Sequence, residues 1–260
     1  TVYCQGNSYE KMFASNSVGG TLTWYSNPTL TNVIVNGSLL EPYDSTGTRN
    51  YYVTEKSGVC ESTPSIVTIT IDPLPTAEIS GSTEICEGDS AQVTINMTGE
   101  APFSLTYTDG SQNTTINTSN NTYAFYTKKQ ATYTLVSMSD NNGCSADSLT
   151  GQAEIIVNDN PNTTISPLSP ASVCKNADLQ LNGNPGGGAG GFTHQWTGQT
   201  TYLSETDTVA PVFNASLTGN YQLSYQVTDI NGCQANDSIT IEVNKQPAIS
   251  ISPSGPEEIC

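Results

Sequence analysis

Hydrophobic and polar residues alternate over short stretches along the whole chain, a period of two that is typical of β-strands. The middle of the chain shows this most simply, where Val93, Ile95 and Met97 are separated by polar residues. The same alternation occurs at Phe103, Leu105 and Tyr107; Tyr133 and Leu135; Leu179 and Leu181; His194 and Trp196; and Tyr221, Leu223, Tyr225 and Val227. No stretch combines a helical period with capping residues. The pattern therefore predicts short strands joined by turns.

Cysteines mark a repeat of this strand pattern about every 85 residues. A first cysteine opens each repeat, and a second cysteine closes it shortly before the last strand. The opening cysteines are Cys4, Cys86, Cys174 and Cys260, and the closing cysteines are Cys60, Cys144 and Cys233. Roughly seven short strands per repeat predict an all-β fold made of tandem immunoglobulin-like β-sandwich domains in a linear array.

The spacing of the seven cysteines predicts disulfides within each repeat. We expect the pairs Cys4–Cys60, Cys86–Cys144 and Cys174–Cys233, with Cys260 unpaired or paired to a missing fourth repeat. This assumes that both cysteines of a pair lie at the same pole of the sandwich. Each bond would close a loop of nearly 60 residues and stabilise the repeat by about 4 kcal/mol. Such bonds would also carry tension past the strands between the two cysteines.

Composition narrows the functional classes. The net charge is −17, which disfavours binding to nucleic acid or to anionic lipid. No apolar stretch is long enough to insert into a membrane, and the chain opens on strand-like sequence, so we expect a mature or excised segment. There is no CxxC motif and His194 is the only histidine, so neither a zinc site nor a serine-histidine-acid triad is predicted. We therefore predict no enzyme activity, no catalytic residues and no cofactor.

Several segments resemble a known group of repeats. Val2-Tyr3-Cys4, Leu22-Thr23-Trp24-Tyr25 and Tyr51-Tyr52-Val53 are similar to the Ig-like repeats of Bacteroidota surface proteins. These proteins are exported by the type IX secretion route and include gliding-associated adhesins. The stretches from His194 to Gly198 and from Tyr221 to Cys233 resemble the PKD-like repeats of the same proteins. The resemblance implies a secreted bacterial cell-surface protein.

The linkers divide the chain into domains. We predict Ig-like repeat 1 at residues 1–72, Ig-like repeat 2 at 73–158, PKD-like repeat 3 at 159–244, and a linker with the start of a fourth repeat at 245–260. The linker Asn158-Asp159-Asn160 resembles the joints at which cadherin-like arrays bind calcium. The equivalent linkers carry Asp72 alone or Asn244-Lys245, so calcium is not the favoured interpretation.

Core-spaced aromatic residues and Asp-Ser or Asp-Thr motifs offer two further kinds of candidate site. Trp24, Tyr107 and Trp196 follow their opening cysteines at nearly equal distances, which favours one core position over exposed sugar-binding faces. Asp followed by Ser or Thr and a small or aliphatic residue or Thr is the O-glycosylation signal of Bacteroidota envelope proteins. Conditional on the resemblance, this signal makes candidates of Ser45, Ser90, Ser148, Thr208 and Ser238.

The predicted function is a structural stalk or filament segment of an extracellular adhesin, a disulfide-stapled spacer that bears load. Its expected partners are further repeats of the same chain, identical chains in a fibre, and covalent glycans. The alternative is a binding module that recognises glycans or neighbouring subunits through its loops, for which Gly186 to Phe213 is the best candidate.

Overall fold

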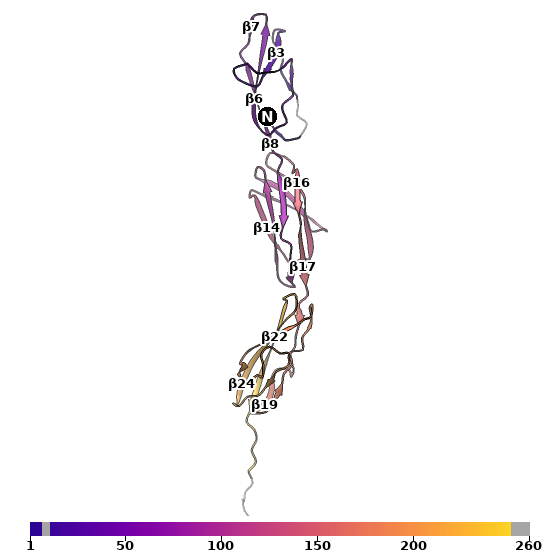
Figure 1. The fold of residues 1–260 in the computed structure, drawn as a ribbon, viewed down its shortest axis with the longest axis vertical. Helices are drawn as coiled ribbons and strands as arrows, with labels where there is room; N and C mark the ends of the chain where they lie inside the picture. The colour runs from indigo at the N-terminus through magenta and orange to yellow at the C-terminus, as the bar shows by residue number, and fades with distance from the viewer. Residues whose placement is uncertain (7–10, 251–260) are drawn as a thin grey trace, which may run out of the picture. The chain divides into compact units, whose positions relative to one another are not determined.

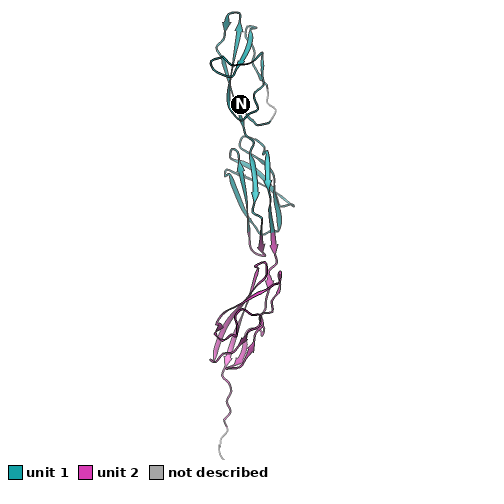
Figure 2. Ribbon diagram, in the orientation of Figure 1, with its two compact units in different colours: residues 1–83, 91–155 teal, residues 84–90, 156–260 magenta. Residues whose placement is uncertain are grey.

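The structure is a computed structural model that describes residues 1–6 and 11–250, and within these residues its regular elements are β-strands and one single-turn 3₁₀ helix (Figure 1). The prediction of an all-β fold is confirmed. The chain divides into two compact units, residues 1–83 with 91–155 and residues 84–90 with 156–260 (Figure 2). No helix among the described residues is long and apolar enough to cross a membrane.

The first repeat is built on one sheet with strand order β1-β8-β6-β3-β4, in which β7 also pairs with β6. A separate pair, β2 with β5, lies outside this sheet. Trp24 and Tyr51 are almost fully buried in its core, together with Leu40 from β5. The strands are β1 (Val2–Cys4), β2 (Met12–Phe13), β3 (Thr21–Tyr25), β4 (Val33–Asn36), β5 (Leu39–Leu40), β6 (Gly47–Ser57), β7 (Cys60–Glu61) and β8 (Ser65–Asp72).

The second repeat has two sheets, in the orders β10-β17-β15-β12-β13 and β14-β11-β9-β16. Its core comes from the alternating positions of β11 and β12, from Val93 to Met97 and from Phe103 to Tyr107, as the sequence pattern predicts. The strands are β9 (Thr76–Ser80), β10 (Thr83–Cys86), β11 (Ala91–Thr98), β12 (Phe103–Thr108), β13 (Asn113–Thr118), β14 (Thr122–Thr127), β15 (Ala131–Ser139), β16 (Ser148–Gly151) and β17 (Ala153–Asn158).

The alternation is interrupted in β15. Thr106 faces Ser137 while Tyr107 faces Leu135, so Val136 is an extra residue in the ladder. Such a bulge moves later side chains to the opposite face. The buried positions accordingly change from Tyr133 to Met138, and Leu135 is only half-buried.

The third repeat is built on the sheet β19-β25-β24-β22, with two short pairs, β18-β21 and β20-β23, beside it. Trp196 lies at its centre with its ring centroid 4.8 Å from that of Tyr225. The elements are β18 (Pro161–Asn162), β19 (Ala171–Cys174), β20 (Leu179–Gln180), β21 (Gly186–Gly187), β22 (Thr193–Gly198), the 3₁₀ helix η1 (Thr200–Tyr202), β23 (Val212–Phe213), β24 (Gly219–Thr228) and β25 (Gln234–Asn244).

The predicted shared core position of the three aromatic residues is confirmed. Trp24 and Trp196 are 1% exposed and Tyr107 is 8% exposed. Each indole also donates a hydrogen bond to a backbone carbonyl, from Trp24 to Gly37 and from Trp196 to Thr208. The tryptophans therefore serve packing, and neither offers a free face to a sugar.

Replacing Trp196 with alanine is expected to destabilise the third repeat by about 3–5 kcal/mol, because the change leaves a cavity in its core. Hydrogen exchange of the β24 and β25 amides measures this directly as faster exchange. Leu217→Ala is the matched control, since Leu217 is 61% exposed. Equal exchange in the two variants would contradict the assignment of Trp196 to the core.

Candidate functional site

The opening cysteine of each repeat lies at the end of the first strand, beside the end of the last strand. β1 runs parallel to β8 and places Cys4 opposite Asp72, and β19 runs parallel to β25 and places Cys174 opposite Asn244. The residue after each opening cysteine donates its N–H to the carbonyl that ends the last strand, at 2.9 Å in all three repeats: Gln5 to Asp72, Glu87 to Asn158, and Lys175 to Asn244. The three opening cysteines therefore occupy equivalent positions.

The closing cysteine of each repeat lies near the beginning of the last strand. Cys233 immediately precedes β25, an 11-residue strand. At about 3.3 Å per residue, such a strand is roughly 33 Å long. A disulfide requires its two Cα atoms to be within about 7 Å. The two cysteines of one repeat are therefore too far apart to bond.

The structure pairs cysteines of consecutive repeats. Cys4 bonds to Cys144 and Cys86 bonds to Cys233, with Cα–Cα distances of 5.4 and 5.5 Å. The predicted pairing within repeats, Cys4–Cys60, Cys86–Cys144 and Cys174–Cys233, is wrong. It failed because the first strand is parallel to the last, so the opening cysteine lies at the pole opposite the closing one. Cys60 and Cys174 are exposed thiols, and Cys260 lies outside the described residues.

An aspartate holds each bonded closing cysteine in the same loop. Oδ1 of Asp140 accepts the N–H groups of Asn142 and Cys144, both at 3.0 Å. In the third repeat, Oδ1 of Asp229 accepts the N–H groups of residues 231 and 233 in the same way. The N–H of Ala189 and those of the loop lower the pKa of Asp229.

The two loops share the sequence pattern Asp-x-Asn-Gly-Cys, and each glycine has a positive φ, 76° at Gly143 and 85° at Gly232. The pattern is visible in the sequence, although its role in presenting a cysteine to another repeat is not. The loop of the first repeat differs, because Lys56 stands where the aspartate would be. There the chain forms a hairpin in which Ser57 faces Cys60.

The Cys4–Cys144 bond has a polar contact beside it within the first unit. Nδ2 of Asn142, in the closing loop, donates to Oδ2 of Asp72 at 2.7 Å. Asp72 ends the last strand of the first repeat. The closing loop of one repeat is thus held at the end of the preceding repeat by a disulfide and a hydrogen bond.

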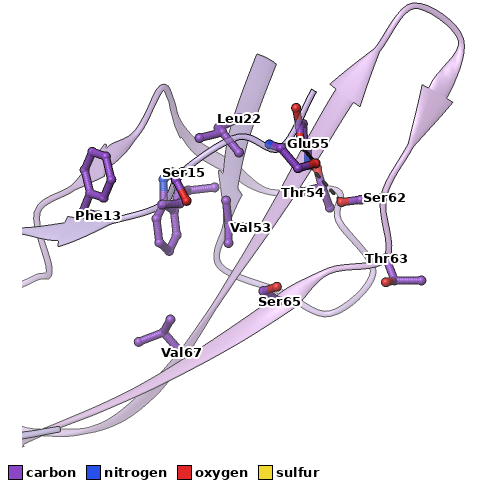
Figure 3. A pocket seen from close by; sticks show the side chains of 13 residues that line it. Phe13, Ser15, Leu22, Val53, Thr54, Glu55, Ser62, Thr63, Ser65 and Val67 are labelled. Carbon is purple, nitrogen blue, oxygen red and sulfur yellow. Dashed lines mark hydrogen bonds between the residues drawn. The ribbon is translucent and has the colours of Figure 1, made fainter. Parts of the chain in front are cut away.

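A hollow of about 390 Å³ lies in the first repeat (Figure 3). Leu22, Val53, Val67 and Glu55 are among the residues that line it. The Glu55 carboxylate accepts N–H groups from Ser17, Val18 and Gly20 and the hydroxyl of Ser17. These hydrogen bonds, the Ser17 N–H first among them, lower the pKa of Glu55 to about 2. The carboxylate therefore anchors the 17–20 loop.

The comparisons with known proteins agree with this architecture. The family described as "Ig-like domain CHU_C associated" matches residues 1–73. The family described as "Nucleoporin POM152, Ig-like domain" matches residues 75–152. No curated protein matches the chain.

The chain is a tandem of immunoglobulin-like domains.

The chain is also similar to solved structures at low sequence identity. Extracellular domains 3–5 of Drosophila OTK are 13% identical, with a TM-score of 0.37 over 94% of both chains. A bacterial ice-binding adhesin, from a study of its retention at a host cell surface, is 13% identical, with a TM-score of 0.40 over 92% of this chain and 89% of that one. The fibronectin(III)-like modules of Clostridium thermocellum CbhA are 13% identical, with a TM-score of 0.34 over 65% and 94%.

The linker Asn158-Asp159-Asn160, for which calcium was not the favoured interpretation, is held by side-chain hydrogen bonds. Nδ2 of Asn158 donates to Glu84, and Nδ2 of Asn160 donates to the carbonyl of Glu87. Asp159, which lies between them in sequence, is exposed. Across the described ranges, no group of three or more His, Cys, Asp or Glu residues could hold a metal ion.

The glycosylation candidates are spread over all three repeats. Ser45, Ser90 and Ser238 are exposed, whereas Ser148 and Thr208 are half-buried. Ser148 begins β16 and Ser238 lies within β25, so neither sits on a loop tip. Attachment of glycans at these residues stays a prediction.

The single histidine, His194, packs against a core residue of the third repeat. Nδ1 of His194 lies 2.7 Å from the hydroxyl of Tyr225, which is itself fully buried, and the two rings stack. His194 thus has a packing partner.

Glu55→Gln is expected to destabilise the first repeat at neutral pH, because an amide replaces the carboxylate that accepts the loop N–H groups. The folded pKa is depressed, so the stabilisation is present above the usual pKa of 4.5 and is lost as the pH falls toward about 2. Denaturation followed by Trp24 fluorescence in a Trp196→Phe background should show the difference from wild type shrinking over that range. Glu78→Gln, on an exposed position, is the control. A difference that does not change with pH would contradict this role.

Serine substitutions distinguish the two pairing schemes. Cys60→Ser should leave Cys4 protected from alkylation, whereas Cys144→Ser should expose Cys4 and lower the free energy of unfolding by about 2–5 kcal/mol. Alkylation under denaturing, non-reducing conditions followed by peptide mass spectrometry measures both. Alkylation of Cys4 in the Cys60→Ser variant would overturn the pairing between repeats.

Proposed function

We propose that this chain is a load-bearing stalk segment of an extracellular bacterial surface adhesin, in which disulfides join consecutive immunoglobulin-like repeats. The observation that carries the proposal is the pair of bonds Cys4–Cys144 and Cys86–Cys233. The family match over residues 1–73 supports a bacterial surface protein, the setting that the sequence resemblance implies. Disulfides form and persist in oxidising compartments, which supports an extracellular location.

The two bonds close overlapping loops. One loop encloses residues 4–144 and the other encloses residues 86–233. Every peptide bond between Cys4 and Cys233 lies inside at least one loop. A single cut of the backbone anywhere in this range therefore leaves one covalent molecule. Bonds confined to single repeats would leave each linker as the sole covalent connection.

This arrangement suits a spacer under tension. Between the first two repeats, the linker after Asp72 and the Cys4–Cys144 bond run in parallel, so neither carries the whole load. If every strand were pulled apart, the shortest covalent path from Thr1 to Asn244 would include roughly 70 residues, or about 250 Å. With both bonds reduced, roughly 240 residues would extend to about 850 Å.

The Gly186–Phe213 segment of the third repeat gives less support to a binding function. Tyr202, at the end of η1 in this segment, packs edge-on against Tyr221, with ring centroids 5.4 Å apart. The carbonyls of Thr206 and Thr208 accept the backbone and indole N–H groups of Trp196. Much of the Gly186–Phe213 segment is thus used to complete its own repeat, and no observation favours the binding alternative.

A protease site placed in the linker Pro73-Leu74-Pro75 tests the proposal. After complete cleavage, the protein should migrate on a denaturing gel as one species without reductant and as two species with reductant, because Cys4–Cys144 spans the cut. A molecule tethered at its two ends should likewise hold under force after cleavage and release only when reductant is added.

Cys4→Ser in the same background is the matched control. This variant should separate on cleavage alone, since no other bond spans the linker in the described structure. Separation of the unsubstituted protein without reductant would refute the double connection. Load bearing would be refuted if the cleaved protein migrates as one species without reductant but the tethered molecule releases at once under force.

A further inference from the structure

We propose that Cys174 forms a disulfide with the closing cysteine of another immunoglobulin-like repeat, one whose loop carries the Asp-x-Asn-Gly-Cys pattern. The inference names a site and the chemistry of its partner, and it holds whether or not the array serves as a stalk.

Cys174 has the same surroundings as the two opening cysteines that are bonded. Its strand β19 pairs in parallel with β25, as β1 pairs with β8, and Lys175 repeats the hydrogen bond made by Gln5 and Glu87. A turn with positive φ follows each opening cysteine, at Gly6 (74°), Gly88 (98°) and Asn176 (62°). The N–H of Ala177 donates to the carbonyl of Cys174, as that of Asp89 does to Cys86. The thiol of Cys174 is exposed at this end.

The two bonded opening cysteines identify the class of partner. Each bonds to the cysteine of an Asp-x-Asn-Gly-Cys loop, Cys144 or Cys233, and each partner belongs to the next repeat along the chain. Both of these loop cysteines are already bonded. Cys60 belongs to the first repeat, and its hairpin has Lys56 in place of the aspartate. The partner of Cys174 is therefore a closing cysteine of another repeat.

The end of β25 also offers the polar group that such a loop requires. In the first junction, Asp72 accepts a hydrogen bond from Asn142 of the closing loop. Asn244 occupies the position of Asp72, opposite the opening cysteine, and is exposed. Its amide oxygen can accept the same bond from the asparagine of the pattern. Cys174 and Asn244 together match the receiving end seen at Cys4 and Asp72.

Bond formation requires a disulfide oxidant, since two thiols lose two protons and two electrons when they join. A small disulfide such as oxidised glutathione accepts them and becomes two thiols. Exchange proceeds through a mixed disulfide at one cysteine, which the thiolate of the other cysteine then displaces.

Disulfide mapping of the exported full-length protein from its native source tests the inference. Free thiols are blocked before unfolding, and peptides are then compared with and without reductant. The Cys174 peptide should be found joined to a peptide with the Asp-x-Asn-Gly-Cys pattern from another repeat. An alkylated Cys174, or a bond to any cysteine outside such a loop, would overturn the inference.

A chain in which a second copy of residues 73–158 follows Asn244 gives an independent measurement. After oxidation with a glutathione redox buffer, alkylation of Cys174 should fall by roughly tenfold or more relative to the 260-residue chain. The control carries serine in place of the copied Cys144 and should restore full alkylation. Protection of Cys4 and Cys86 in the same sample shows that the repeats are folded. Full alkylation of Cys174 in that folded sample would refute the proposal.

Discussion

The parallel pairing of the first strand with the last strand is the constraint on which the covalent architecture depends. It sends the first strand toward the end of its repeat, so the opening cysteine emerges beside Asp72, Asn158 or Asn244. The closing cysteine precedes the last strand and lies a strand length away. Because a disulfide spans only a few ångströms between Cα atoms, Cys4 and Cys86 each bond to the closing cysteine of the following repeat.

The residues that form the cores of the repeats differ from those that connect the repeats covalently. Each repeat has its own aromatic core, around Trp24, Tyr107 or Trp196. The bonds act instead at the ends of the repeats, where Asp140 and Asp229 shape the loops that present the closing cysteines. Core packing and covalent connection are therefore separate functions of separate residues. A change in one can be made without removing the other.

Much of the fold could be predicted from single residues and their spacing. Alternation identified the buried faces of β11, β12 and β24, since every second side chain of a strand points to the same side. The prediction was less accurate in β15, where the extra residue Val136 changes the face that is buried. A bulge depends on the pairing of two strands, so local alternation cannot show it. The aspartates of the closing loops were missed because their role appears only when a cysteine has a partner.

The sequence by itself determined that the chain forms cysteine-bearing immunoglobulin-like repeats, because strand periodicity, turn residues and core aromatics are local properties. Only the tertiary structure decided which cysteines bond. Spacing gives the separation of two residues along the chain, and Cys4 is far closer to Cys60 than to Cys144 by that measure. The direction of the strands reverses this order in space. The length of β8 separates Cys4 from Cys60, whereas Cys4 and Cys144 meet at one end of the repeat.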